Sequence, residues 1–214
     1  MWRARRRAML VPGSASRPRQ VEGVNVRVRC ATARQASGGA ATVAPRPGRR
    51  RRPPQGSVAA DGPLAPGAPA PSFVLETRPG QTLALADWIG RPIILAFYPG
   101  DWEEVSTDQL RQYQEALPDL RAFGAALLAI SVDSAWSHAA FAAVRGLEFP
   151  LLADFEPKGA VALRYGTYNG ALGRSERALF LLDSRGVIQW RHVSPPGVNP
   201  GVHGILTALE LLSA

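Results

Sequence analysis

The stretch that decides the fold spans residues 93–106 and reads IILAFYPGDWEEVS. Its first six residues are all apolar or aromatic, which is typical of a strand buried on both faces of a sheet. Pro99 and Gly100 end that run. Beyond Ser106, apolar residues recur at the spacing of one helix face, and Pro118 marks a break or a new first turn. Ser106 is therefore predicted where a buried strand gives way to a helix.

Two further apolar runs follow this stretch toward the C-terminus. Residues 127–132 and residues 178–183 are each predicted to form a buried strand. A helix is predicted over residues 135–144, with Ser134 as its candidate cap and Gly146 as its end. Because strands and helices alternate here, we expect neighbouring strands to run parallel.

The C-terminal third of the chain predicts a hairpin and two more helices. Gly186 suits a turn that joins the strand of residues 178–183 to a strand over residues 187–193. Helices are predicted over residues 158–164 and 201–212. Together these elements predict an α/β fold, a thioredoxin-like sandwich with a central mixed sheet flanked by helices.

Residues 1–60 differ in composition from the rest of the chain. They hold 14 of the 25 basic residues and a single acid, Glu22, for a net charge of +13, which leaves −5 for residues 61–214. This segment has no sustained apolar period and cannot offset its chain entropy, so we expect a disordered Arg/Pro/Gly-rich extension before one folded domain over residues 61–214. The arginines of residues 49–52 are expected to belong to a solvated tail, the alternative being weak polyanion binding.

The sequence also excludes several classes of protein. No apolar run reaches the roughly 18 residues of a membrane-spanning helix, so we expect no membrane association and a cytoplasmic location. The apolar residues 8–11 end at Pro12, too early for a secretory signal, although an organellar transit segment remains open. Cys30 is the single cysteine. With no cysteine pair and no paired histidine spacing, neither a cofactor nor a metal is expected.

Five segments carry a resemblance to a known family. They are residues 67–73, 90–99, 131–134, 149–154 and 177–183. In this order and spacing, residues 64–214 resemble the peroxiredoxins, the alkyl hydroperoxide reductase and thiol-specific antioxidant family. The resemblance implies a thioredoxin-like fold and, by ancestry, a thiol-dependent peroxidase.

The family's active-site pattern implies a role for four residues. That pattern is a proline, a threonine or serine, and a reactive cysteine, completed by a distant arginine. Pro99 matches the proline and Arg177 the arginine, while Glu103 stands at the threonine or serine position and Ser106 at the cysteine position. A cysteine thiolate attacks the peroxide O–O bond and becomes a sulfenic acid, whereas a serine hydroxyl stays protonated and has no stable oxidised counterpart.

A second serine fits the same interpretation. In similar relatives, a stretch resembling residues 136–141 often carries the resolving cysteine, and Ser137 stands at that position here. Loss of both sulfurs is what a chain relieved of the peroxidase cycle could tolerate.

Glu103 leads to a sharper hypothesis. Its family counterpart points into the pocket that Arg177 lines, so we expect the Glu103 carboxylate to pair with the Arg177 guanidinium. The alternative is that Glu103 points to water.

Other interpretations of the remaining residues carry less support. Ser106 as a hydrolase nucleophile would need a base within reach, and none of the three histidines is expected beside it. His138 is expected to be an ordinary helix residue. Trp102 and Trp136 are expected to pack over the helix that follows Ser106, rather than to line a ligand pocket.

The sequence thus predicts a peroxiredoxin-family domain that has lost its peroxidase activity and serves in binding or regulation. Its expected partners are a second copy in a homodimer, or active relatives. Two alternatives stay open: residual thiol-dependent reduction of peroxide, and polyanion binding through the arginine-rich extension.

Overall fold

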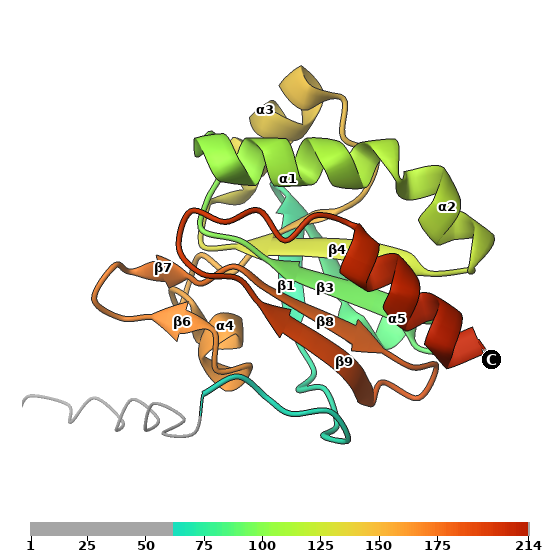
Figure 1. Cartoon of the computed structure of the whole chain (residues 1–214). Helices are drawn as coiled ribbons and strands as arrows, with labels where there is room; N and C mark the ends of the chain where they lie inside the picture. Colours follow the sequence, from blue (N-terminus) through green and yellow to red (C-terminus); the bar gives the residue numbers. More distant parts are fainter. Residues whose placement is uncertain (1–61, 214) are drawn as a thin grey trace, which may run out of the picture. The chain divides into compact units, whose positions relative to one another are not determined.

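The computed structural model describes residues 62–213, so the predicted extension of residues 1–60 and its boundary lie outside it. Within that part of the chain, a seven-stranded sheet lies between helices in the order β2-β1-β5-β4-β3-β8-β9 (Figure 1). These strands are β1 (Val74–Arg78), β2 (Gln81–Ala84), β3 (Ile93–Phe97), β4 (Ala126–Ser131), β5 (Leu151–Ala153), β8 (Ala178–Leu182) and β9 (Ile188–Val193). The predicted sandwich with a mixed central sheet is confirmed.

Strand β3 is an interior strand beside the central strand β4, and it is buried on both faces as its unbroken apolar sequence predicts. All five of its residues are buried. It runs parallel to β4 on one side and antiparallel to β8 on the other. The predicted hairpin is also present, since β8 and β9 pair antiparallel.

The alternation of side chains along β3 supplies two separate cores. Ile94 and Ala96 face a core that includes Leu110, Phe141 and Leu209 from the helices on one side. The neighbouring residues of β3 face the opposite core, which includes Val161, Ala162 and Tyr165. The sheet is therefore buried on both faces, and β3, like its neighbours β4 and β8, supplies side chains to both cores.

Capping residues, a proline and glycines explain where the helices begin and end. Their bounds are α1 (Glu104–Glu115), α2 (Leu117–Ala122), α3 (Ala135–Arg145), α4 (Ala160–Arg164) and α5 (His203–Ser213), with a single 3-10 turn η1 (Leu85–Trp88). Glu103 caps α1, Pro118 lies in the first turn of α2 as predicted, and Gly146 ends α3 with a φ of 64°. The fourth helix starts two residues later than predicted because Gly159 adopts a left-handed conformation with a φ of 69°.

Three features of the sheet were not predicted. Strand β5 joins the sheet parallel to β4, and the β1–β2 hairpin pairs with β5 at that edge. A separate two-stranded ribbon is formed by β6 (Tyr168–Asn169) and β7 (Arg174–Ser175). Strand β5 has three residues and each ribbon strand has two, so none carries a readable sequence period. Among residues 62–213, no helix is long and apolar enough to cross a bilayer.

Candidate functional site

Ser106 lies in the first turn of α1 and is fully buried. Its hydroxyl donates to the Glu103 carboxylate, with Oγ and Oε2 2.5 Å apart, and accepts from Arg177 Nη1 at 3.2 Å. The backbone N–H of Ser106 donates to the same Glu103 oxygen at 2.6 Å. The serine is thus held by a carboxylate on one side and a guanidinium on the other.

The predicted contact between Glu103 and Arg177 is confirmed. Arg177 Nη2 lies 3.0 Å from Glu103 Oε2, with the Arg177 side chain 4% exposed and that of Glu103 33% exposed. Burial opposes ionisation of Glu103, but hydrogen bonds from Ser106 and Arg177 outweigh it and lower the pKa of this carboxyl. Glu103 is therefore a charged partner of Arg177 rather than a side chain directed to water.

Strand pairing explains how Arg177 reaches a residue so distant in sequence. Phe97 at the end of β3 is the register partner of Ala178 at the start of β8. Arg177 therefore sits beside the point where the chain leaves β3 toward α1. Pro99, on that connection, joins Glu103 and Arg177 in lining a small cavity of about 90 Å³.

Gln109 completes this site and was not predicted. Arg177 Nη1 donates to Gln109 Oε1 at 2.7 Å, and Gln109 Nε2 donates to the Tyr113 hydroxyl at 3.0 Å. The signal was present in the spacing, because Gln109 follows Ser106 by three residues and shares its helix face. Arg177 Nε is buried with no hydrogen-bond partner among the described residues.

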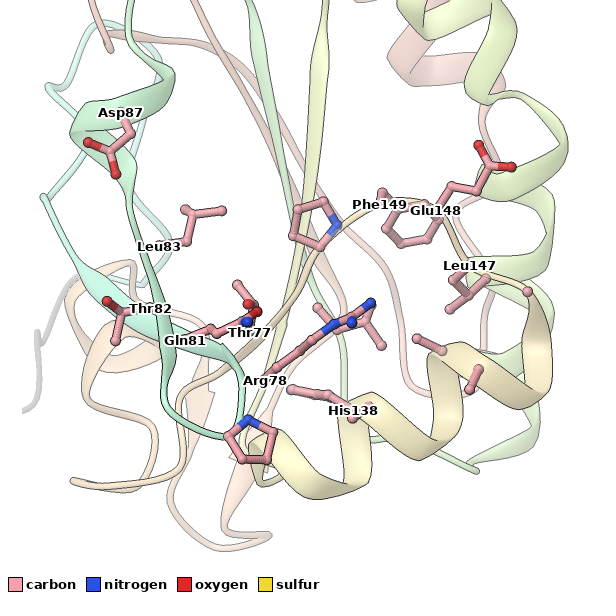
Figure 2. Close-up of a pocket in the computed structure, with 17 residues that line it drawn as sticks. Thr77, Arg78, Gln81, Thr82, Leu83, Asp87, His138, Leu147, Glu148 and Phe149 are labelled. Carbon is pink, nitrogen blue, oxygen red and sulfur yellow. The ribbon is translucent and has the colours of Figure 1, made fainter.

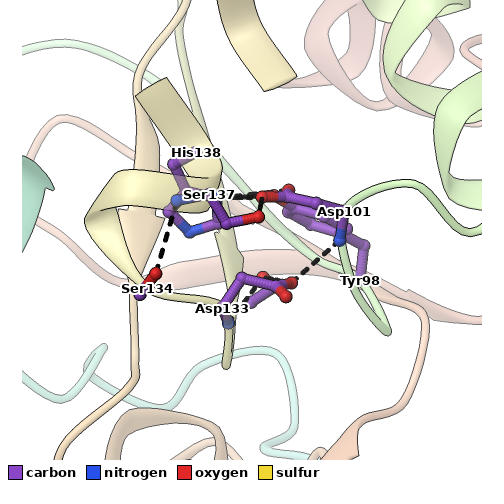
Figure 3. A network of polar contacts seen from close by, with 7 residues as sticks. Tyr98, Asp101, Asp133, Ser134, Ser137 and His138 are labelled. Carbon is purple, nitrogen blue, oxygen red and sulfur yellow. Dashed lines mark hydrogen bonds and ion pairs between the residues drawn. The ribbon is translucent and has the colours of Figure 1, made fainter. Parts of the chain in front are cut away.

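Ser137 belongs to a second cluster, centred on Asp101 (Figure 3). Its hydroxyl donates to Asp101 Oδ2 at 2.7 Å, and the Tyr98 hydroxyl donates to Oδ1 at 2.8 Å. His138 Nδ1 lies 3.0 Å from Oδ2, and the side chains of His138 and Asp101 are both fully buried. The side-chain hydrogen bond of Ser137 in the described chain thus joins it to Asp101 and not to the group around Ser106.

The expectation that His138 is an ordinary helix residue is wrong. Burial of Asp101 raises its pKa, but the hydrogen bond and charge of His138, with the hydroxyls of Ser137 and Tyr98, outweigh that effect and lower it. The two residues meet because Asp101 follows β3 and His138 follows the adjacent parallel strand β4. In addition, the Asp101 N–H donates to Asp133 Oδ2 at 2.8 Å at that edge.

The packing predicted for the two tryptophans over the helix that follows Ser106 is wrong for Trp136, which is 75% exposed, and the ring that Trp102 contacts belongs to α3 instead. Trp102 stacks edge to face on Phe141 of α3, with ring centroids 4.9 Å apart, and is half exposed. Neither ring lines the cavity beside Glu103.

The surroundings of Ser106 do not suit a hydrolase nucleophile. Its hydroxyl is inaccessible, and its hydrogen-bond acceptor Glu103 has a lowered pKa because hydrogen bonds from Ser106 and Arg177 outweigh the effect of burial, which makes that carboxylate a weak base. Within residues 62–213, no three or more His, Cys, Asp or Glu side chains are grouped so as to hold a metal ion.

The sheet order, the helix that starts beside β3 and the arginine before β8 define a thioredoxin-like protein of the peroxiredoxin type. The chain belongs to the AhpC/TSA family, whose model matches residues 66–191.

Curated relatives and solved structures agree with this assignment. Alkyl hydroperoxide reductase E of Mycobacterium tuberculosis is 35% identical over 132 residues, which cover 61% of this chain and 86% of the relative. The chloroplastic peroxiredoxin Q of Triticum aestivum is 34% identical over 161 residues, covering 73% and 70%. The crystal structure of Enterococcus faecalis AhpC superposes with a TM-score of 0.64 at 25% identity, covering 69% of this chain and 92% of that one.

Proposed function

We propose that this protein is a peroxiredoxin-family domain without thiol peroxidase activity, in which Ser106 replaces the peroxidatic cysteine and the domain serves in binding or regulation. One observation carries the proposal. The Ser106 hydroxyl lies in the first turn of α1 within hydrogen-bond reach of Arg177, at the place where the family pattern puts its thiolate.

The chemistry of the replacement supports the loss of activity. In the thiol reaction, the thiolate sulfur forms a bond to one peroxide oxygen, the O–O bond breaks, and the other oxygen leaves as an alcohol or water after taking up a proton. The helix N-terminus and a nearby arginine favour this reaction because they stabilise the thiolate. A hydroxyl ionises far less readily than a thiol, and the Ser106 hydroxyl keeps its proton in a hydrogen bond to Glu103.

Glu103 is a second obstacle to peroxide chemistry. Its carboxylate accepts hydrogen bonds from Ser106 Oγ and from Arg177, so the charge that would stabilise a thiolate is already paired. We infer that restoring the cysteine alone restores little activity, and that removal of the carboxylate is also required.

Peroxide consumption with an external thiol reductant tests this proposal. The natural protein and Cys30→Ser are expected to show no enzymatic turnover, Ser106→Cys a low rate, and Glu103→Thr with Ser106→Cys a clearly higher rate. Ser72→Cys places a thiol on the exposed surface and is the control for unspecific thiol oxidation. Turnover by the natural protein that survives Cys30→Ser would contradict the proposal.

That contradicting result would instead support residual peroxide reduction, the activity named for the alkyl hydroperoxide reductase and peroxiredoxin relatives. The retained Pro99 and Arg177 are what favours this second candidate. A homodimer or pairing with active relatives stays a prediction, which mass determination at micromolar concentration would test. Polyanion binding and a cytoplasmic location also stay predictions.

A further inference from the structure

Trp102 links the two polar clusters and has an unusual backbone conformation. It follows Asp101, the centre of the buried cluster, and precedes Glu103, the cap of α1. Its φ is 64°, and among residues 62–213 it is the only residue other than glycine with a positive φ. The Cβ of a side chain makes this left-handed conformation costly, so neighbouring contacts must hold it. Backbone strain of this kind is concentrated at functional sites, which makes the contacts on either side of Trp102 informative.

Asp101 fixes the chain just before this strained residue. Its side chain is fully buried and accepts hydrogen bonds from the hydroxyls of Tyr98 and Ser137, at 2.8 and 2.7 Å. His138 Nδ1 lies 3.0 Å from Asp101 Oδ2. The Asp101 N–H donates in addition to Asp133 Oδ2. Both the backbone and the side chain of Asp101 are therefore tied to other elements, namely the end of β3, the segment after β4 and helix α3.

Gly100 allows the loop to approach the segment after β4 closely. A Cβ added at Gly100 would come within 3.2 Å of Asp133 Oδ2, the oxygen that accepts from the Asp101 N–H. A side chain at position 100 would therefore push the loop away from this acceptor. The residue before the anchor thus suits the anchoring contact.

His138 shields the anchor on the side of α3. It lines a groove of about 1140 Å³ between the β1–β2 hairpin and α3 (Figure 2), and Asp101 is not among the residues that line this groove. His138 is 1% exposed and the Asp101 side chain is fully buried, so water in the groove is kept from the carboxylate. Hydrogen bonds in such an environment are stronger than those at the surface.

Glu103 fixes the chain just after Trp102. Its Oε2 accepts from the Ser106 N–H at 2.6 Å and from Arg177 Nη2 at 3.0 Å. The direction of the Glu103 side chain depends on the backbone of the residue before it. A rotation of Trp102 from φ 64° to the ordinary negative range would turn the chain at Glu103 and move its carboxylate away from both donors.

We propose that Asp101 is a positioning residue for the site around Ser106. Its buried contacts hold Trp102 in the left-handed conformation. That conformation in turn keeps the Glu103 carboxylate in contact with Ser106 and Arg177. The inference goes beyond the proposed function, because it concerns what holds the site in its geometry and not what the site does.

Carbon-13 NMR of the Glu103 carboxyl group as a function of pH tests the anchor in the full chain, with Glu103→Gln identifying the signal. The pKa of Glu103 lies below its usual 4.5 because hydrogen bonds from Ser106 and Arg177 outweigh the effect of burial. Asp101→Asn keeps the shape of the side chain but replaces one acceptor oxygen with an amide donor. In this variant the pKa of Glu103 is expected to rise toward 4.5, and an unchanged pKa overturns the proposal.

Leu95→Ala is the control for a general loss of stability. Leu95 is buried on β3 and faces the core that also holds Val161, on the other face of the sheet from Tyr98. Its truncation should destabilise the protein and leave the pKa of Glu103 unchanged. If Leu95→Ala raised this pKa as much as Asp101→Asn, the rise would reflect loosened packing alone, and the positioning role would be wrong.

Two substitutions of Trp102 test the left-handed conformation itself. Trp102→Asn and Trp102→Val both remove the ring that packs on Phe141, so they share that loss. Asparagine enters the left-handed region readily, whereas the branched Cβ of valine strongly disfavours it. The pKa of Glu103 is expected to stay low in Trp102→Asn and to rise toward 4.5 in Trp102→Val, and equal values overturn the proposal.

The Trp102 pair leaves the buried cluster around Asp101 unchanged, so it tests the proposal independently of how well Asp101→Asn folds. Every measured quantity here is a carboxyl pKa. The outcomes therefore do not depend on whether the natural protein reduces peroxide.

Discussion

At the scale of single residues, the Glu103 carboxylate satisfies several donors at once. It caps α1 through the N–H groups of Val105 and Ser106, accepts from the Ser106 hydroxyl, and pairs with Arg177. A threonine or serine, as in the family pattern, would cap the same helix with a neutral oxygen. Glu103 therefore keeps the cap and adds a charge opposite the buried guanidinium.

Glu103→Ala is expected to lower the free energy of unfolding at pH 7 by about 1 to 2 kcal/mol, because a cap and a partly exposed ion pair are lost together. Glu103 ordinarily titrates near 4.5, and its pKa is lowered in the folded protein. Its contribution is therefore complete above about pH 4.5 and disappears as the pH falls through the lower folded-state value. Urea denaturation of the natural and variant proteins at pH 7 and at pH 3 measures both the loss of unfolding free energy and its dependence on pH.

Glu104→Ala is the matched control, since Glu104 is exposed in the same turn and makes no side-chain hydrogen bond or ion pair in the described chain. It should change the unfolding free energy by less than about 1 kcal/mol, the size of a helix-dipole contribution. A Glu103→Ala protein as stable as the Glu104→Ala protein at pH 7 would show that the pair with Arg177 contributes nothing.

The sequence predicted one of the two polar clusters and missed the other. Glu103 and Arg177 occupy positions of a family pattern, so their contact could be expected before any strand was paired. Asp101 and His138 are 37 residues apart. Their contact depends on β3 and β4 lying side by side and on the direction in which α3 leaves β4. No local spacing encodes that geometry.

At the scale of elements, glycines and capping residues in the sequence predicted the ends of helices better than local patterns predicted the short strands. Gly146 ends α3 where expected because it adopts φ 64°, a conformation that residues with a Cβ avoid. Strand β5, by contrast, has too few residues for a period and gains its place from pairing with β4 and β1. Short edge elements are fixed by tertiary contacts, which a local pattern does not carry.

Gly146→Ala is expected to destabilise the protein by about 1 kcal/mol through backbone strain alone. A Cβ added at Gly146 would meet no atom within 4 Å, so no steric clash contributes. Gly170→Ala is the matched control, because that position also has open space and no positive φ. Thermal denaturation followed by circular dichroism should show a lower midpoint for Gly146→Ala only, and equal midpoints would contradict the strain.

At the scale of the whole molecule, the two cores meet on opposite faces of one sheet. Leu95 belongs to the core beneath α4, and Leu110 to the core beneath α1, and both are fully buried. Because β3 supplies side chains to both, neither core can lose its packing while the sheet stays intact. The described part of the chain should therefore unfold in a single cooperative transition.

Leu95→Ala and Leu110→Ala are each expected to lower the free energy of unfolding by about 3 kcal/mol, the usual loss for a leucine in a filled core. The two side chains lie on opposite faces and belong to separate clusters, so the double variant should lose about the sum of the two effects. Chemical denaturation followed by tryptophan fluorescence and by far-ultraviolet circular dichroism should give coincident curves for each protein. If Leu110→Ala separated the two curves, the helical layer would be melting before the sheet, and the shared strand would not couple the cores.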